Sequence, residues 1–221
     1  MDKTEIKAFV FDAYGTLLNI NSLDERLVFY FGETSAQKIS EAWRRKQLEY
    51  TWLRTLMTRY EPFSKVTSHA LDFAFKSLSI HLDDHIRNDL LERYFTLSVF
   101  PEVPEILKKL SVQYKLAILS NANPEMLEAA VKHNQIDAYI SSILSADSIR
   151  LFKPRPEVYE LTLKHLQIKK EEIAFISSNT WDVAGAKSFG LKSIWLRRKA
   201  GNMEELGFEP DKVIDQLGDL L

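Results

Sequence analysis

The sequence contains no cysteine among its 221 residues, which excludes disulfides, thiolate nucleophiles and metal sites with cysteine ligands. Glycine and proline are sparse, at seven residues each, and neither a low-complexity linker nor a repeat is visible. No apolar run approaches the roughly 18 residues of a membrane span, and no long apolar segment typical of a signal peptide opens the chain. These absences predict a cytoplasmic enzyme or binding protein with no membrane partner.

The charged residues are nearly balanced, with 29 lysines and arginines, 31 aspartates and glutamates, and a net charge of −2. A general nucleic-acid binder needs a basic excess to neutralise phosphates, so the composition argues against nucleic acid as a partner. Apolar residues make up 45% of the chain and charged residues 27%, which is typical of an ordinary globular core. At this length we expect one large domain, or one domain with a sizeable insertion.

Short apolar runs recur along the chain and predict the strands of a parallel sheet. Each run is nearly continuous, which is typical of strands that are covered on both faces. The four clearest runs are 7–11, 115–119, 173–176 and 192–196, and a weaker fifth is 139–147. Helical patterns lie between them, roughly at 101–111, 125–133, 156–166 and 182–189. This alternation predicts an α/β fold with helices on both sides of the sheet.

Residues 19–97 break the alternation, because they show helical patterns without strands. The segment 40–60 predicts a helix with one apolar stripe, formed by Leu48, Trp52, Leu53, Leu56, Met57 and Tyr60. Segments 68–78 and 87–97 predict two further helices. We therefore expect a core domain formed by 1–18 and 98–221, and a helical cap domain at 19–97. A cap over strand ends excludes water and supplies substrate contacts.

Polar residues follow three of the predicted strands, at the edge where open parallel sheets bind ligands. These residues are Asp12, Tyr14 and Thr16, then Ser120 and Asn121, then Ser177, Ser178, Asn179 and Asp182. Asp12 precedes a turn that contains glycine, and it is either a nucleophilic carboxylate or a cap of a turn or helix. The third group suits hydrogen bonds to a carboxylate or a developing oxyanion, with Asp182 activating water. The alternative is an ordinary loop in which Asp182 caps a helix.

Arg44 lies on the predicted long helix of the insertion. Leu48 and Trp52 follow it at i+4 and i+8, so Arg44 shares their apolar face. On such a face a guanidinium binds an anion, forms an ion pair with a carboxylate, or extends its charged end to the solvent. Arg45 lies off that face and is within reach of Glu49 at i+4, which is typical of a solvated surface charge.

Lys153 comes before two prolines that stop regular structure. A lysine at a strand edge can pair with Asp12 and keep it ionised, although an isolated lysine is more often a surface residue. Tyr159 begins the next helix, and its side chain either points its hydroxyl inward or belongs to the core.

Several motifs of other enzyme classes are absent. The five histidines do not fall in a metal-binding spacing such as HExxH. No GxSxG, GxxxxGK or GxGxxG motif occurs, which disfavours a Ser-His hydrolase, a P-loop NTPase and a dinucleotide oxidoreductase.

The motifs FDAYGTL, LSNAN, KPRPEVYE and SSNTWD, in this order, resemble the haloacid dehalogenase superfamily. The stretch WRRKQLEYTWLRTLM together with SSNTWD is similar to the 2-haloacid dehalogenases that act on the L (S) enantiomer, so the resemblance spans nearly the whole chain. It implies a Rossmann-like core with an inserted α-helical cap. It also implies a homodimer, since family members are commonly homodimers.

The Mg-dependent phosphatases of this superfamily carry a second aspartate two residues after the first, where this chain has Tyr14. They also place several acidic residues in the last motif, where this chain has only Asp182. A hard dication needs several oxygen ligands, and a leaving alkoxide needs a proton donor. Both departures argue against phosphoryl transfer, and we expect neither a metal nor another cofactor.

The resemblance implies the following chemistry for a short L-2-haloalkanoic acid. Asp12 attacks C2 in line with the carbon–halogen bond, the configuration inverts, and an aspartyl ester forms while halide leaves. Water then attacks the ester carbonyl of Asp12, which regenerates the carboxylate and releases a D-2-hydroxy acid.

The resemblance also implies roles for the site residues. Thr16, Lys153, Ser177 and Asn179 would fix the Asp12 carboxylate, and Asp182 with Asn179 would position or activate the water. Ser120 and the backbone around Ala13 and Tyr14 would hold the substrate carboxylate, and Arg44 and Asn121 would lie where the halide departs. Tyr14, Phe63 and Trp181 would form an apolar wall, and Tyr159 would contact the substrate and support Lys153. The small Ala13 side chain would enlarge or reorient the pocket.

Two alternatives stay open at this point. The first is a Mg-dependent phosphatase or phosphonatase of the same superfamily, and the second is a non-catalytic relative that binds a small carboxylate. Sensitivity of turnover to a chelator separates the dehalogenase from the phosphatase.

Overall fold

A six-stranded parallel sheet forms the centre of the molecule in the computed structural model, which describes residues 5–221. The strand order is β3-β2-β1-β4-β5-β6, and every neighbouring pair is parallel. The strands are β1 (Ala8–Phe11), β2 (Lys115–Ser120), β3 (Ser142–Ser145), β4 (Ile173–Ser177), β5 (Lys192–Leu196) and β6 (Lys212–Ile214). The first five match the predicted runs. The sixth has three residues, two of them exposed, so it gives no apolar signal in the sequence.

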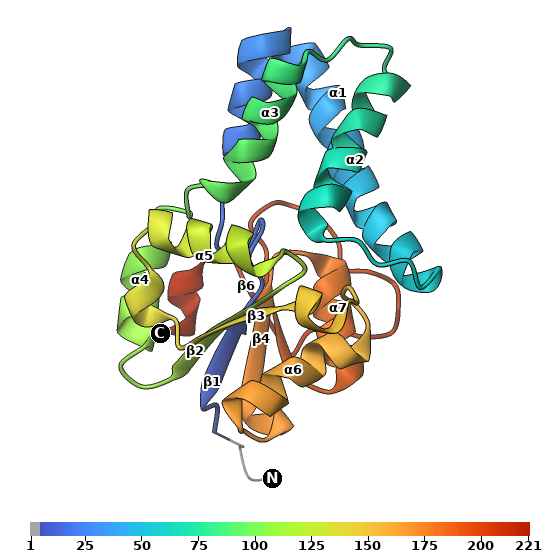
Figure 1. The fold of residues 1–221 in the computed structure, drawn as a ribbon. Helices are drawn as coiled ribbons and strands as arrows, with labels where there is room; N and C mark the ends of the chain where they lie inside the picture. The colour runs from blue at the N-terminus through green and yellow to red at the C-terminus, as the bar shows by residue number, and fades with distance from the viewer. Residues whose placement is uncertain (1–4) are drawn as a thin grey trace.

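Helices cover both faces of the sheet (Figure 1). The covering helices are α4 (Val103–Leu110), α5 (Pro124–His133), α6 (Pro156–Leu166) and α7 (Thr180–Phe189). Along β1, Phe9 and Phe11 join the core cluster that contains α4 and α5, while Ala8 and Val10 join the cluster that contains α6. Both faces of the strand are therefore buried, which explains its continuous apolar sequence.

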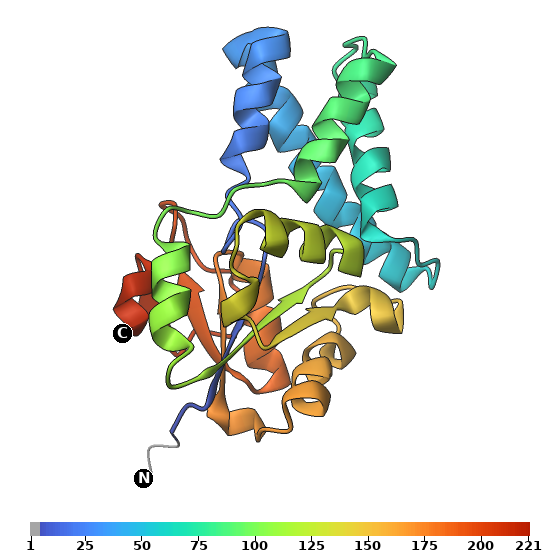
Figure 2. The same ribbon diagram turned by 60° about the vertical axis from the view of Figure 1, so that its left-hand side comes forward.

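Three helices interrupt the chain between β1 and α4, and they stand together over one end of the sheet (Figures 1 and 2). They are α1 (Asn21–Leu56), α2 (Phe63–Ser77) and α3 (Asp84–Glu92), and a short 3-10 helix (Arg93–Phe95) follows α3. Gly32 breaks α1, because its φ of 72° is not helical. The predicted fold class, an α/β core with an inserted helical cap, is confirmed. Among residues 5–221, no helix is long and apolar enough to cross a bilayer.

The apolar stripe predicted for the end of α1 is not the face that this helix buries. Leu53, Leu56 and Met57 are 41%, 79% and 57% exposed. The helix instead buries a face that includes Trp43, Gln47 and Thr51. Trp43 and Gln47 donate hydrogen bonds to Thr67 of α2, and the Thr51 hydroxyl donates to the Leu48 carbonyl within α1. Such partners cannot be recognised in an apolar pattern.

Candidate active site

Asp12 lies directly after β1, at the end of the sheet that the cap covers, and is 6% exposed. The chain then folds into a tight loop in which the Ala13 carbonyl accepts hydrogen bonds from the N–H groups of Thr16, Leu17 and Leu18. Gly15 adopts a φ of 85°, a conformation that favours glycine. This loop returns the Thr16 side chain to Asp12.

Four side chains donate hydrogen bonds to the Asp12 carboxylate. Its Oδ2 accepts from Thr16 Oγ1 at 3.0 Å, from Asn179 Nδ2 at 2.7 Å and from Ser177 Oγ at 3.3 Å. Its Oδ1 accepts from Lys153 Nζ at 3.1 Å. The structure thus brings together all four residues that the sequence predicted around Asp12, and the orientation of the carboxylate is fixed.

The Lys153 ammonium lies between two carboxylates, and its side chain is 1% exposed. Besides Asp12 it contacts Asp182 Oδ2 at 2.7 Å. Burial alone would lower the pKa of this lysine, but the charges of Asp12 and Asp182 outweigh the burial and raise it. Lys153 is therefore a permanent positive charge beside the candidate nucleophile, and the reading of it as a surface residue is excluded.

Asp182 is fully buried in the first turn of α7. Burial raises the pKa of its carboxyl to about 6, the charge of Asp12 adds to this shift, and Lys153 opposes it. Its Oδ1 accepts a hydrogen bond from the Tyr159 hydroxyl at 2.7 Å. Asp182 is thus not a surface cap of the helix but a buried group whose carboxyl pKa is about 6.

Tyr159 is one prediction that the structure corrects. We expected it to support Lys153 and to contact substrate, but it is fully buried behind the site and donates its hydrogen bond to Asp182. Gly185 of α7 leaves room for this arrangement, because a Cβ at that position would collide with the Tyr159 hydroxyl. Burial raises the pKa of Tyr159 well above its usual value, so it remains a donor.

A small cavity of about 20 Å³ lies beside Asp12, between the core and the cap. Its lining consists of Asp12, Tyr14, Arg44, Leu48, Phe63, Ser120, Asn121, Lys153, Asn179 and Trp181. A volume of this size holds about one water molecule. The space directly beside Asp12 is therefore smaller than a haloacid in this structure, and Arg44 and Asn179 also line a larger cavity of about 370 Å³.

The lining contains six of the eight residues that the sequence predicted as substrate contacts, namely Tyr14, Arg44, Phe63, Ser120, Asn121 and Trp181. Ala13, like Tyr159, was predicted as a substrate contact but does not line the cavity. Its side chain is 1% exposed and packs in the core cluster, so it does not shape the cavity. Leu48 is a lining residue that we did not assign, although its i+4 spacing from Arg44 was the available signal.

Arg44 connects the cap to the core. Its Nη2 donates to Asn179 Oδ1 at 3.1 Å, and its Nη1 donates to Gln47 Oε1 at 3.1 Å. Arg45 is exposed, as its place on the helix predicted, although Glu49 pairs with Lys46 instead of with Arg45. The only lining cations are Arg44 and Lys153, and they favour an anionic ligand.

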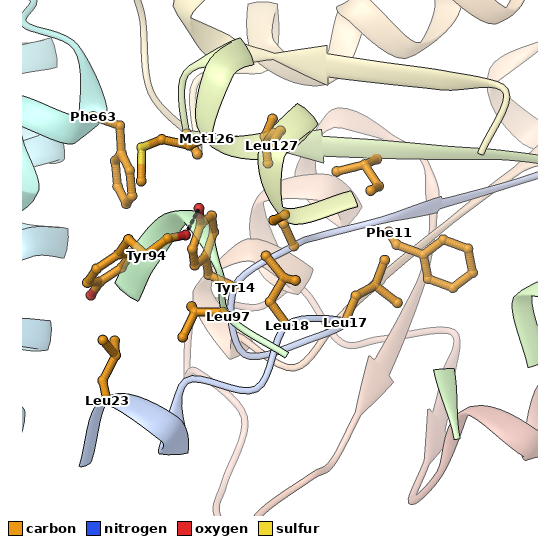
Figure 3. Packing of buried hydrophobic residues seen from close by; sticks show 14 of the residues in the cluster. Phe11, Tyr14, Leu17, Leu18, Leu23, Phe63, Tyr94, Leu97, Met126 and Leu127 are labelled. Carbon is orange, nitrogen blue, oxygen red and sulfur yellow. Dashed lines mark hydrogen bonds between the residues drawn. The ribbon is translucent and has the colours of Figure 1, made fainter. Parts of the chain in front are cut away.

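Tyr14 occupies the position two residues after Asp12 and is buried among aromatic and aliphatic side chains (Figure 3). Its ring centroid lies 6.1 Å from that of Phe63 and 5.6 Å from that of Tyr94. Its hydroxyl donates to the Tyr94 carbonyl at 3.2 Å, and burial raises its pKa far above the usual value. Tyr14 therefore presents an apolar ring to the cavity and is not an acid like the aspartate of the phosphatases.

The sequence pattern of the haloacid dehalogenase-like hydrolase family matches residues 6–190. The (S)-2-haloacid dehalogenase 4A of Burkholderia cepacia is 42% identical over 210 residues, which cover 94% of this chain and 89% of that protein. An (S)-2-haloacid dehalogenase of Pseudomonas sp. (strain YL) is 40% identical over 96% of this chain and 91% of its own length. The crystal structure of the L-2-haloacid dehalogenase of Xanthobacter autotrophicus with covalently bound chloropropionic acid superposes with a TM-score of 0.89. It is 34% identical and covers 97% of this chain and 96% of its own.

Proposed function

The chain belongs to the haloacid dehalogenase-like hydrolase family, and from this premise we propose that it is an (S)-2-haloacid dehalogenase. It hydrolyses short L-2-haloalkanoic acids to D-2-hydroxy acids with inversion at C2. The observation that carries this proposal is the Asp12 carboxylate, which four donors fix beside a small cavity that Arg44 lines. Such a site suits a small organic anion with a leaving group that departs without a proton.

In the first step Asp12 attacks C2, and the electron pair of the carbon–halogen bond leaves with the halide. Three donors already engage Oδ2, while Oδ1 has only the contact with Lys153. We therefore assign Oδ1 as the attacking oxygen. The product of this step is an ester between Asp12 and the inverted C2, and the positive charge of Arg44 stabilises the departing halide.

In the second step water attacks the ester carbonyl of Asp12. The donors at Oδ2, from Thr16, Ser177 and Asn179, stabilise the negative charge that develops on this oxygen. Asp182 accepts the proton of the water, since its pKa of about 6 leaves it mostly ionised at neutral pH. The C2–O bond stays intact. The bond between the Asp12 carbonyl carbon and Oδ1 breaks instead, and the 2-hydroxy acid leaves with Oδ1 and takes up the proton that Asp182 had accepted. The oxygen of the attacking water remains in the carboxylate of Asp12, and Asp182 is ionised again.

Substrate recognition follows from the other lining residues. We assign the substrate carboxylate to the Ser120 hydroxyl and the backbone N–H groups of Ala13 and Tyr14, for which the described residues provide no backbone acceptor. Asn121 lies with Arg44 on the halide side. Tyr14, Phe63 and Trp181 contact the alkyl group of the substrate.

We propose that residues 19–97 act as a cap domain that opens from the core domain, 1–18 and 98–221, in every turnover. Two backbone hydrogen bonds pair the connections between these parts, from Asn19 N to Ser98 O at 2.7 Å and from Phe100 N to Leu17 O at 3.0 Å. The space beside Asp12 holds about one water molecule and is smaller than a haloacid, which supports such an opening.

A dication does not fit the carboxylates of this site. The Lys153 ammonium already lies between Asp12 and Asp182, at 3.1 and 2.7 Å, so a dication held by these two carboxylates would face a fixed positive charge. Within residues 5–221, no group of three or more histidine, aspartate or glutamate side chains is arranged to hold a metal ion. We therefore assign the reaction to the residues alone, and a Mg-dependent phosphatase is not favoured.

The deciding experiment measures halide release from L- and D-2-chloropropionate separately, with EDTA present. We expect chloride from the L isomer only, at a rate that EDTA does not change. If neither isomer yields chloride while a phosphate ester is hydrolysed with Mg²⁺, the proposal is wrong.

We further propose that the chain forms a homodimer. The end of α1 exposes Leu53, Leu56 and Met57 within five residues, and such an exposed apolar cluster is typical of a contact surface.

A further inference from the structure

Arg198 follows β5 and extends back to the loop after β1. Its Nε donates to the Thr16 carbonyl at 2.8 Å, and its Nη1 donates to Glu102 Oε1 at 2.8 Å. The guanidinium carbon lies 3.5 Å from the centroid of the Phe100 ring. The side chain is only 12% exposed. Two hydrogen bonds and one stacked ring therefore fix a planar group that has little freedom to move.

The residue that Arg198 holds is one of the donors to Asp12. Thr16 is fully buried, and its hydroxyl donates to Asp12 Oδ2 at 3.0 Å while it accepts from the Ser178 N–H at 2.9 Å. Among residues 5–221, the loop hydrogen bonds leave the Thr16 carbonyl without a backbone partner, and Arg198 supplies the donor. A continuous set of contacts thus runs from Glu102 through Arg198 and Thr16 to the nucleophile.

Arg198 occupies this place at an energetic cost. Burial lowers the pKa of its guanidinium below the usual value, although Glu102 opposes the shift. Its Nη2 is buried and has no hydrogen-bond partner among the described residues. A buried donor without a partner destabilises the folded state, and an apolar side chain would avoid that cost. A buried polar group that lacks a hydrogen-bond partner, and so destabilises the fold, is typical of functional sites.

We propose that Arg198 is a positioning residue for Asp12, and that it acts by fixing the main chain of Thr16. The inference rests on the proposed function, because it concerns the same nucleophile. Without Arg198 the loop relaxes, the Thr16 hydroxyl no longer holds Oδ2, and both ester formation and ester hydrolysis slow. A shift of a fraction of an ångström is enough, since catalysis depends steeply on such geometry.

The first test compares two neighbouring arginines. Arg198→Met should lower kcat for halide release from L-2-chloropropionate about tenfold or more, because one oxyanion-stabilising donor is misplaced. Arg197→Met removes the same charge one position earlier, where the side chain is exposed and pairs with Asp215 at 2.9 Å. This control should keep kcat within about twofold of the wild type. Equal losses in the two variants would overturn the proposal.

A double-mutant cycle tests the route through Thr16. Thr16→Val removes the hydroxyl that Arg198 is proposed to place, so Arg198→Met in that background should lower kcat by less than about twofold. If Arg198→Met lowers kcat by the same factor in both backgrounds, Arg198 does not act through Thr16. A merely structural role would not produce this dependence on the Thr16 hydroxyl.

Arg198→Lys covers the case in which the methionine variant does not fold. Lysine keeps the positive charge but lacks the planar guanidinium that donates to Thr16 and Glu102 at once. We therefore expect a folded protein with a reduced kcat and an unchanged mid-point of urea unfolding. A kcat equal to that of the wild type would overturn the proposal. If the wild-type protein itself releases no halide, the proposed function fails instead of this inference.

Discussion

At the scale of single residues, Asp182 links the chemistry to pH. Burial in a site that already contains the negative charge of Asp12 raises its pKa to about 6. A base must be ionised to accept a proton, so kcat should fall as the pH falls through about 6. The Tyr159 hydroxyl favours the ionised form, because it donates a hydrogen bond to Oδ1.

The first prediction concerns Tyr159→Phe. Loss of this hydrogen bond removes a stabiliser of the charged carboxylate, so the acid limb of the kcat profile should move up by about one pH unit. The measurement is kcat for halide release between pH 4.5 and 9 for both proteins. Unchanged limbs would show that Asp182 is not the base.

The second prediction compares Arg44→Ala with Arg45→Ala. Arg44 lines the cavity and contacts Asn179, so its loss should lower kcat/KM about 100-fold or more. Arg45 is exposed on the same helix, and its loss should change kcat/KM less than about threefold. Steady-state halide release under matched conditions decides the matter, and equal losses would remove Arg44 from its assigned place.

The sequence predicts the positions of some of these residues but not the contacts of others. Asp12, Ser120 and Asn179 were predictable as neighbours, because parallel strands bring their carboxyl ends to one edge of a sheet. The partner of Tyr159 was not predictable, because it depends on how closely α6 and α7 approach at Gly185. Arg198 gave no signal either, since its contacts with Thr16 and Glu102 join segments that are far apart in the sequence.

At the scale of elements, α1 shows where apolar patterns mislead. Its buried face carries Gln47, which accepts from Arg44 and donates to Thr67 Oγ1 at 2.7 Å. The exposed end carries the leucines that a pattern would bury. In contrast, β1, β2, β4 and β5 were predicted to within one residue at each end, because burial on both faces leaves only apolar choices. The strand β3 is shorter than its predicted run, and β6 was not predicted.

The third prediction therefore concerns Gln47→Ala. The change leaves the Thr67 hydroxyl and an Arg44 N–H without their partner and opens a void, so the free energy of unfolding should fall by about 1–3 kcal/mol. Gln37→Ala is the matched control, because Gln37 is exposed on the same helix and its amide donates a hydrogen bond to the nearby Glu41 side chain. Its effect in urea unfolding should stay within about 0.5 kcal/mol. Similar losses for both would contradict the account of the buried face.

At the scale of the whole molecule, the exposed cluster at the end of α1 leads to the fourth prediction. Light scattering after size-exclusion chromatography should give the mass of two chains. Leu56→Lys should shift the protein toward the mass of one chain, because it places a charge in the apolar contact. Val112→Lys is the control, since Val112 is 80% exposed but lies on the core, away from α1. A wild-type protein with the mass of one chain would refute the proposed homodimer.

The hydrogen bonds around Asp12 also have a consequence for biosynthesis. The donors Lys153, Ser177 and Asn179 follow Asp12 by 141, 165 and 167 positions. A ribosome therefore makes the nucleophile 141 to 167 positions before these three partners. Until they are made, the carboxylate at the end of β1 has only Thr16 among its four side-chain donors. The hydrogen bonds that fix Asp12, and with them the proposed catalytic competence, are completed only when Asn179 has been synthesised and β4 has paired with β1.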